Sequence, residues 1–509
     1  MNLKISEESK EDVTNIALDT IKIGKQAIVF VNSKRSAEKT AEDISKKIKN
    51  VSRKELSDKV LAVLSSPTKQ CERLAKCMDK GIAFHHSGLV GKQRELIEQN
   101  FKNGSVKIIC ATPTLACGID MPAFRTIIRD LKRYSKHGMV WIPVLEYMQQ
   151  AGRAGRPRYD KEGQAILIAS DESQKDEFVD RYIYGEPENI YSKLAVEPVL
   201  RTYVLSLISS GFVRNERELL DFFSKTFWAH QYGDIRELNR KIVRVIEMLE
   251  DFEFIKRADF TSADEQVRIT ATLMGKRIAE LYLDPLTAHN FIEALKKATS
   301  KHSAISFLHL VCNSIEMTPL LKIKAKEYEE INGVFLKQEN LMLVKEPSMY
   351  DSEYDYYMNA FKTALMLNSW IDEVSEEELM QKYDVRPGEL HVKLEIANWL
   401  LYSCQEISRI AKFQGLITEL TKLRIRVNYG VKEELLILLK LRNIGRVRAR
   451  KLYINKIKTI SDVRSADIGL LSRILGLKIA QDVKDQVTGK KDGSDIDDNL
   501  DVSLKKFSN

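Results

Sequence analysis

Short apolar runs alternate with helical segments along residues 25–170. This alternation is typical of an α/β layer, in which parallel strands form a sheet and helices cover its faces. We predict a ligand site at the carboxyl ends of these strands, where open parallel sheets bind their ligands. A helix is predicted over "SAEKTAEDISKKI" (36–48), with Ser36 as its N-terminal cap. The strands are expected in "QAIVFV" (26–31), "GIAFHH" (81–86), "VKIICAT" (106–112), "TIIR" (126–129) and "GQAILIA" (163–169).

Helical periodicity replaces the strand pattern from about residue 185 onward. Apolar residues recur at helical spacing in 193–212 and 234–255, and a short strand is predicted at the start of 267–283. Helices followed by a small β wing suggest a winged-helix module, although other small α+β folds fit the same pattern. Residues 286–425 read as helical almost throughout, and two compact helix–turn–helix units follow them.

Composition narrows the class of protein only moderately. A chain of 509 residues is too long for one hydrophobic core, so several domains are expected. Its net charge of +8 permits nucleic-acid binding without proving it. The six cysteines form no CxxC pair, which favours buried thiols in a reducing cytoplasm and argues against a zinc or other metal site. No run approaches the roughly 20 apolar residues that span a membrane, and no signal peptide is evident.

Three segments carry candidate chemistry, and the first two of them stand at expected strand ends. They are "FHHSGL" (84–89), "CATPTLACGIDMPA" (110–123) and "YMQQAGRAGRPRYD" (147–160). A Thr-Pro at a strand end leaves a hydroxyl and backbone donors for a phosphodiester, and closely spaced arginines suit phosphate. Each of the first two segments, taken alone, is more typical of a polar loop between strand and helix.

Together these segments resemble motifs IV, V and VI of superfamily 2 helicases, in their second RecA-like domain. Gln149-x-x-Gly152-Arg153-x-Gly155-Arg156 matches the QxxGRxGR pattern at every fixed position. The resemblance implies that Arg156 is an arginine finger on the γ-phosphate of ATP and that Arg153 is its neighbour. The other implied contacts are Gln149, Gly152, Gly118 and Asp120 for the nucleotide, and Thr112, His86, Ser87 and Gly88 for the nucleic-acid backbone.

The downstream segments resemble the archaeal fork-repair DNA helicases, relatives of the helicase half of DNA polymerase theta. The resemblance covers nearly all of residues 25–485 and rests on "SKLAVEPVLRTYVLSLI", "ATLMGKRIAELYLDP" and "NIGRVRARKLY". It implies a multidomain chain with an α/β RecA-like domain followed by three further domains and a tail. The expected boundaries are 1–182 for the second RecA-like domain, 183–285 for a winged helix, 286–425 for an all-α ratchet domain, 426–488 for a helix-hairpin-helix domain and 489–509 for a disordered tail.

The resemblance also implies roles for a hairpin and for residues of the expected ratchet helix. Residues 129–144 stand where the family places a strand-separating β-hairpin; the alternative is an ordinary surface excursion. Trp399, in the expected ratchet helix 388–403, matches the tryptophan that stacks on an unwound base; the alternative is a core tryptophan. Val392 replaces the arginine that the family often has seven residues earlier, so His391 or Lys393 would have to substitute.

A group of arginines lies in the expected helix-hairpin-helix domain. Arg446, Arg448 and Arg450 follow Gly445, and a hairpin turn with free amides and flanking arginines suits phosphate binding without base reading. The alternative is a solvated basic helix face. The tail segment 501–508 faintly resembles a sliding-clamp-binding motif, which makes a sliding clamp a further expected partner.

Neither GxxxxGK[ST] nor a DExH box stands at a strand end, so we expect the first RecA-like domain outside these residues. ATP and Mg²⁺ would then be shared with that domain, and the chain alone would be inactive. It would be either part of a longer or split helicase, or a stand-alone binding protein that has lost the motor. The favoured function is the DNA-engaging half of an ATP-dependent 3′→5′ helicase on forked or branched DNA. An RNA helicase of a related branch is the remaining alternative.

Overall fold

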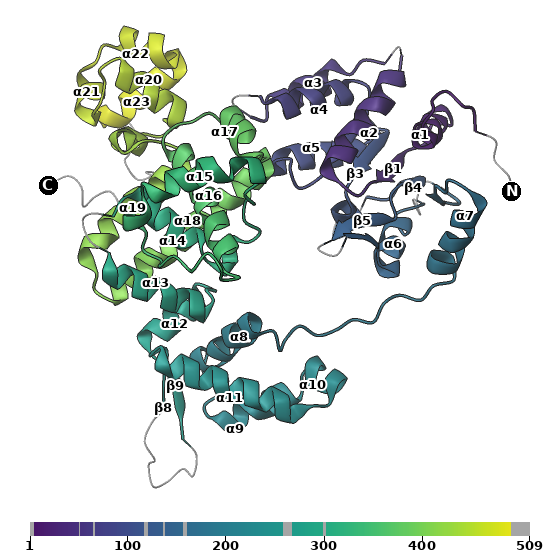
Figure 1. Ribbon diagram of the computed structural model, residues 1–509. Coiled ribbons are helices and arrows are strands. Elements are labelled where there is room, and N and C mark those ends of the chain that lie inside the picture. Colours follow the sequence, from purple (N-terminus) through teal and green to yellow (C-terminus); the bar gives the residue numbers. More distant parts are fainter. Residues whose placement is uncertain are drawn as a thin grey trace. The chain divides into compact units, whose positions relative to one another are not determined.

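The computed structural model describes residues 5–49, 51–64, 67–116, 121–135, 138–155, 160–257, 267–298 and 302–489 (Figure 1). The chain forms two compact units. The sheet unit comprises Met1–Ile190 together with Val385–His391, and the helical unit comprises Tyr191–Asp384 together with Val392–Asn509. Among the described residues, no helix has both the length and the apolar character needed to cross a membrane.

The sheet unit is built on a parallel sheet whose five strands lie in the order β2-β3-β1-β4-β7. All five strands fall within the segments predicted from the apolar runs or within one residue of them, which confirms the α/β layer. A separate antiparallel pair, β5 and β6, lies in the same unit. The strands are β1 Ala27–Phe30, β2 Ile82–His85, β3 Ile108–Ala111, β4 Arg125–Ile128, β5 Lys132–Ser135, β6 Gly138–Trp141 and β7 Gln164–Leu167.

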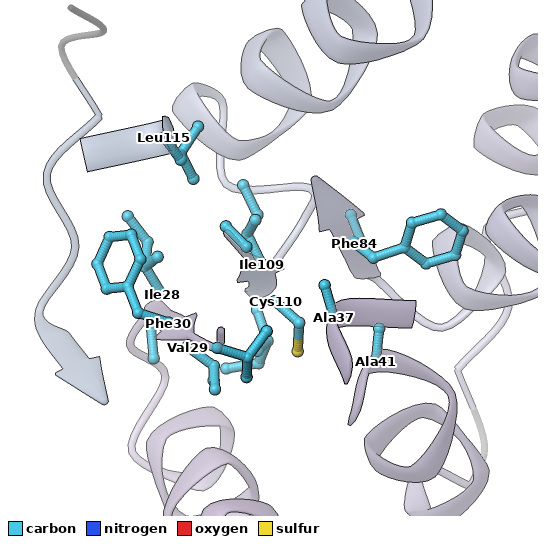
Figure 2. Close-up of a cluster of buried hydrophobic side chains, with 14 of the residues drawn as sticks. Ile28, Val29, Phe30, Ala37, Ala41, Phe84, Ile109, Cys110 and Leu115 are labelled. Carbon is cyan, nitrogen blue, oxygen red and sulfur yellow. The ribbon is translucent and has the colours of Figure 1, made fainter. Parts of the chain in front are cut away.

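Helices pack on this sheet through buried apolar faces. Helix α2 contacts β2 and β3, α4 and α5 contact β2, α1 contacts β1, and α6 contacts β4. The helices of the sheet unit are α1 Asp12–Lys22, α2 Lys34–Lys47, α3 Lys54–Leu61, α4 Lys69–Asp79, α5 Gly91–Lys102, α6 Val144–Ala151 and α7 Glu172–Phe178. Figure 2 shows part of the resulting core, where Ile28, Val29 and Phe30 of β1 gather with Ile109 and Cys110 of β3.

The N-terminal cap of α2 differs from the prediction. Helix α2 begins at Lys34, and the hydroxyl of Ser33 accepts a hydrogen bond from the backbone N–H of Ser36. Ser33 is therefore the cap and Ser36 lies in the first turn. The helical pattern alone placed the start two residues too late, because Lys34 and Arg35 are polar and carry no periodicity signal.

The helical unit begins with helices followed by a small antiparallel ribbon. Helix α8 packs against α11, α12 and α13, and strands β8 and β9 pair in the position of the predicted β wing. Two short helices, α9 and α10, connect α8 to α11. The bounds are α8 Glu197–Ser209, α9 Glu216–Ser224, α10 Phe227–Tyr232, α11 Ile235–Asp251, β8 Ile255–Arg257, β9 Ile269–Ala271, α12 Leu273–Glu280 and α13 Pro285–Lys297.

The rest of the helical unit is all-helical in the described residues, as the periodicity predicted. Helix α16 packs against α14, α17 and α19, and a separate apolar cluster joins α20 to α23. Helix α18 begins in the sheet unit and continues in the helical unit. The bounds are α14 Ala304–Cys312, α15 Tyr328–Leu336, α16 Tyr354–Ile371, α17 Glu376–Tyr383, α18 Pro387–Ile410, α19 Gln414–Tyr429, α20 Arg446–Ile454, α21 Ile460–Ser465, α22 Ile468–Leu475 and α23 Leu477–Thr488.

The predicted buried thiols are confirmed for the cysteines that the structure describes, Cys71, Cys77, Cys110, Cys312 and Cys404. The division between units falls at Ile190, whereas the finer domain boundaries stay predictions. The clamp-like segment 501–508 and the rest of the tail from residue 490 lie outside the described residues.

Candidate functional site

The loops after β2 and β3 lie side by side, because these parallel strands are neighbours in the sheet. The backbone N–H of Thr112 donates to the carbonyl oxygen of His85 at 3.2 Å, which joins the two strand ends. The Thr112 hydroxyl shares a hydrogen bond with that of Thr114 at 3.0 Å, and Thr112 is partly exposed. The predicted nucleic-acid contact at Thr112 therefore has an accessible hydroxyl at the carboxyl edge of the sheet.

The loop after β2 offers fewer contacts than the sequence suggested. The His86 ring is fully buried, stacks on Phe84, and its Nδ1 accepts the Gly88 N–H at 3.1 Å. Gly88 is also buried, and its carbonyl accepts the N–H of Gly388. Only Ser87 is exposed. The His86 ring therefore supports the loop from inside, and Ser87 is the exposed side chain of the loop; the predicted nucleic-acid contact of His86, Ser87 and Gly88 stays a prediction.

Glu38 of α2 is the centre of a buried charge network behind this loop. Its carboxylate accepts hydrogen bonds from Gln70 at 2.8 Å and Arg73 at 2.6 Å. It also lies 3.2 Å from Nε2 of His86 and 3.7 Å from Nε of Arg386. Burial raises the pKa of Glu38, but the hydrogen bonds and cations outweigh it and lower the pKa to about 2. Burial lowers the pKa of His86, so a neutral imidazole beside a charged carboxylate is the stable form near pH 7.

The first turn of α18 closes over the same loop. Arg386 reaches Glu38, and Glu389 forms an ion pair with Lys34 at the start of α2. Gly388 approaches the loop so closely that a Cβ there would lie 2.5 Å from the Ser87 carbonyl oxygen. Glycine fits this position without strain, whereas a Cβ at that distance would force the backbone to move. Neither Glu38 nor this turn was identified from the sequence, since neither carries a motif.

Hydrogen bonds join the loop of the QxxGRxGR segment to the segment 110–123. Nε of Arg153 donates to the carbonyl oxygen of Ala116 at 3.0 Å, and its Nη2 donates to the same oxygen. Backbone hydrogen bonds run from Gly155 N–H to Ala123 O at 2.6 Å and from Ala123 N–H to Arg153 O at 2.9 Å. These contacts hold two sequence motifs together at one edge of the sheet. Gly118, Asp120 and Arg156 lie outside the described residues.

The glycines of this loop have separate steric reasons. Gly155 has φ +92°, a conformation that favours glycine, and a Cβ on Gly163 would lie 2.2 Å from its nitrogen. Gly152 ends helix α6, and a Cβ there would lie 3.0 Å from the Met148 carbonyl oxygen. Gln149 is exposed on the last turn of α6. The fixed glycines of the motif therefore shape a tight loop that carries the arginines.

The adjacent Gln150 was missed from the sequence, because it occupies a variable position of the motif. Its side chain is only 1% exposed, and neither amide atom has a hydrogen-bond partner among the described residues. A buried amide without partners costs about 1–3 kcal/mol. Gln150 is therefore a further candidate functional residue, which lies on α6 just before the loop.

The predicted hairpin within residues 129–144 is confirmed as a structure. Strands β5 and β6 pair antiparallel, with Lys132 opposite Trp141 and Ser135 opposite Gly138. Trp141 anchors the base, where the Lys132 ammonium lies 3.9 Å from its ring centroid. Met139 and Val140 are exposed on the second strand. Its strand-separating role is a proposal.

Trp399 and Lys393 have different surroundings on α18. The Trp399 indole N–H donates to the carbonyl oxygen of Leu281 at 3.0 Å, and the side chain is only partly buried. Lys393 is 6% exposed, and its ammonium donates to the carbonyl oxygen of Pro319 at 2.6 Å. The Lys393 ammonium is thus bound inside the protein in this structure, and its predicted nucleic-acid contact stays a prediction. His391 is exposed.

Two of the three arginines in the first two turns of α20 are also used internally. Arg446 lies over the Trp370 ring at 4.7 Å and donates to the Val374 carbonyl oxygen at 2.8 Å. Arg450 forms ion pairs with Glu373 at 2.6 Å and with Glu434 at 2.7 Å. Their guanidinium groups hold α20 against the turn between α16 and α17, and the predicted phosphate contacts of both residues stay predictions. The third, Arg448, is exposed, although it also donates to a backbone carbonyl of its own turn.

Comparison with known proteins agrees with this geometry. A family described as "Helicase conserved C-terminal domain" matches residues 44–158, and one described as "Archaeal helicase, domain 4" matches residues 305–430. The first match covers β2, β3 and the QxxGRxGR motif, and the second covers all of α18. Together they define the class: an archaeal superfamily 2 helicase.

Individual relatives are more specific. The chain is 40% identical to the ATP-dependent DNA helicase Hel308 of Pyrococcus abyssi over 92% of its own length and 65% of that protein. It is 39% identical to the Pyrococcus horikoshii Hel308 over 91% and 64% of the two lengths. It is 33% identical to the Methanococcus vannielii Hel308 over 94% of its own length and 68% of that protein. The chain belongs to the Hel308 family. It spans about two thirds of the length of these relatives.

Proposed function

We propose that this chain is the DNA-engaging part of an ATP-dependent 3′→5′ DNA helicase that unwinds forked or branched DNA in replication-fork repair and recombination. The observation that carries the proposal is the tether between the two motifs. Arg153 and Gly155 hold the arginine loop against Ala116 and Ala123, which belong to the same connecting segment as Thr112. The nucleotide contacts of the arginine loop and the nucleic-acid contact of Thr112 would then be coupled through that segment.

ATP and Mg²⁺ are shared, in this proposal, with a first RecA-like domain outside these 509 residues. The arginine loop fits an anionic ligand, because it combines guanidinium groups with a glycine-shaped backbone. Arg153 already binds Ala116 and is assigned to positioning the loop. Arg156 is assigned to the γ-phosphate, where an arginine finger is typically worth 10³–10⁵ in rate. Gln149, Gly152, Gly118 and Asp120 would complete the nucleotide side.

The other domains are assigned from their elements. Helices α8, α9 and α11 with the β8–β9 ribbon suit a winged helix. The helices from α13 to α19 suit a ratchet domain, and α20 to α23 suit a helix-hairpin-helix domain. The β5–β6 hairpin is assigned to strand separation, and the tail to a sliding clamp. Trp399 stacks on an unwound base, and Arg448 and His391 lie along the DNA path.

A reconstitution experiment tests the enzymatic part. The first RecA-like domain of the Pyrococcus abyssi relative is mixed with this chain, and ATP hydrolysis is measured with and without single-stranded DNA. We expect little hydrolysis by the chain alone, and DNA-stimulated hydrolysis in the mixture. Arg156→Ala should abolish the stimulation, whereas Arg217→Ala, an exposed arginine of α9, should not. Robust hydrolysis by the isolated chain, or equal activity of Arg156→Ala, would contradict the proposal.

Binding of DNA by the chain itself is tested by fluorescence anisotropy. We expect binding to single-stranded and forked DNA that weakens steeply with salt, because phosphate contacts release counterions. Trp399→Ala should weaken binding of single-stranded DNA roughly 5- to 150-fold, since a stacked base contributes about 1–3 kcal/mol. Trp399→Phe keeps an aromatic face and should retain most of the affinity. DNA binding without stimulated hydrolysis in the mixture would favour a binding protein that has lost the motor, and preference for RNA would favour the RNA-helicase alternative.

A further inference from the structure

Tyr282 occupies an energetically unfavourable position at the end of α12. Its φ is +56°, and it stands one residue beyond the C-cap Leu281, where glycine is the usual choice. Two hydrogen bonds hold the turn: Tyr282 N–H donates to Ala279 O at 3.1 Å, and Leu283 N–H donates to Ile278 O at 3.3 Å. A side chain with a Cβ is strained in this conformation, because the Cβ approaches the following carbonyl oxygen.

Among the residues that the structure describes, burial of the Tyr282 ring does not offset this strain. The Tyr282 side chain is 81% exposed, so its ring gains little from removal of apolar surface from water. The other non-glycine residues with positive φ, among those that the structure describes, are all polar or charged. An exposed aromatic residue at such a position therefore has neither a conformational nor a packing reason to be there.

The neighbouring contacts place Tyr282 next to the candidate stacking residue. Its preceding residue, Leu281, accepts the indole N–H of Trp399 through its carbonyl oxygen. Farther back on α12, Arg277 pairs with Glu406 at 2.8 Å and donates to the Tyr402 hydroxyl at 3.0 Å, both on α18. The turn that carries Tyr282 is thus fixed to the helix that carries Trp399, and both belong to the helical unit.

We propose that Tyr282 is a second base-stacking residue, which adjoins Trp399 and contacts an unpaired base of single-stranded DNA. This inference rests on the proposed function. Stacking suits the position, because every base has an aromatic face and the contact needs no base-specific hydrogen bond. A rigid turn also limits the entropy lost on binding, since the backbone is already ordered by its two hydrogen bonds.

The test uses substitutions that separate binding from folding. Tyr282→Gly removes the ring and relieves the strained φ, so the melting temperature should stay constant or rise. Single-stranded DNA affinity, measured by anisotropy, should nevertheless fall roughly 5- to 150-fold, the loss of one stacked base. Tyr282→Phe should keep nearly full affinity. Tyr350→Ala, which removes a 98% exposed tyrosine elsewhere in the helical unit, should have no effect.

The outcomes also separate this inference from the function on which it rests. If Trp399→Ala weakens binding and Tyr282→Gly does not, the stacking role of Tyr282 is overturned and the proposed function stands. If neither substitution affects binding, the proposed DNA contact of the helical unit fails as well. If Tyr282→Phe loses as much affinity as Tyr282→Gly, the hydroxyl group makes the contact and the stacking role is again overturned. Capture of a protein partner by Tyr282 with DNA binding unchanged would equally overturn it.

Discussion

Substituting Gly388 by alanine should loosen the loop after β2 in a way that can be measured. Gly388 is the second residue of α18, and its N–H donates to the Gly88 carbonyl oxygen at 3.1 Å. A Cβ at this position would lie 2.5 Å from the carbonyl oxygen of Ser87 and 2.6 Å from that of Leu89. Both obstacles are backbone atoms, so no side-chain rotation can relieve the overlap. Either the loop or the first turn of α18 must move.

The expected magnitude follows from two opposing effects. Overpacking a filled site typically costs about 1–3 kcal/mol, and the backbone nature of both contacts favours the upper end. Replacing glycine by alanine in a helix returns up to about 1 kcal/mol. The net loss should therefore be about 2 kcal/mol for Gly388→Ala. For a unit of this size, that corresponds to roughly 4–8 °C in the calorimetric transition of the sheet unit.

Gly415→Ala is the matched control. Gly415 is likewise the second residue of a helix, α19, but a Cβ there would meet nothing within 4 Å. Only the gain in helix propensity should remain, so the melting temperature should stay constant or rise. In Gly388→Ala, hydrogen–deuterium exchange should become faster at the Leu89 amide. In the control Gly415→Ala, exchange should stay unchanged around α19. Equal thermal shifts for the two variants would refute the steric argument.

Three further outcomes are expected. The lowered pKa of Glu38 stabilises the fold by about 3 kcal/mol above pH 4.5, and this contribution is lost as the pH falls towards about 2; Glu38→Gln should flatten that acid dependence in urea unfolding. Arg201→Met leaves the buried carboxylate of Asp284 without its ion-pair partner and should cost about 3–5 kcal/mol. The double variant with Asp284→Asn, which removes the charge and keeps the cap of α13, should recover most of this loss in the same assay. Gly163→Ala should displace the nitrogen of Gly155 and reduce ATP hydrolysis of the reconstituted mixture, while anisotropy finds single-stranded DNA binding unchanged.

The parallel sheet could be predicted from the sequence because its strands are buried on both faces. Such strands are short continuous apolar runs, which need no knowledge of their neighbours to be recognised. "QAIVFV" became β1, and its residues Ile28, Val29 and Phe30 lie in the core (Figure 2). The Thr112 loop was likewise predictable, because a strand end in a parallel sheet determines which edge the next residue occupies.

The charge network behind the loop could not be predicted in the same way. Glu38 meets Arg386 across 348 positions of the chain, and neither residue lies in a recognisable pattern. The same difficulty affected Arg446 and Arg450. A basic helix face looks identical in sequence whether it meets phosphate or acidic groups such as Glu373 and Glu434, and only the folded chain brings those groups within 3 Å.

Internal satisfaction of polar groups therefore distinguishes candidate ligand contacts better than residue type does. Lys393 and Arg450 carry the charges that nucleic acid would attract, yet each already has protein partners, and transferring it to a phosphate would leave those partners unpaired. Trp399 keeps part of its ring exposed after its N–H is satisfied, and Tyr282 exposes most of its ring at a conformational cost. A base stacked on such a ring would bury apolar surface that the fold leaves exposed. The binding energy for single-stranded DNA in the helical unit should consequently reside in aromatic stacking more than in these buried charges, so single-stranded affinity should survive Lys393→Gln and not Trp399→Ala.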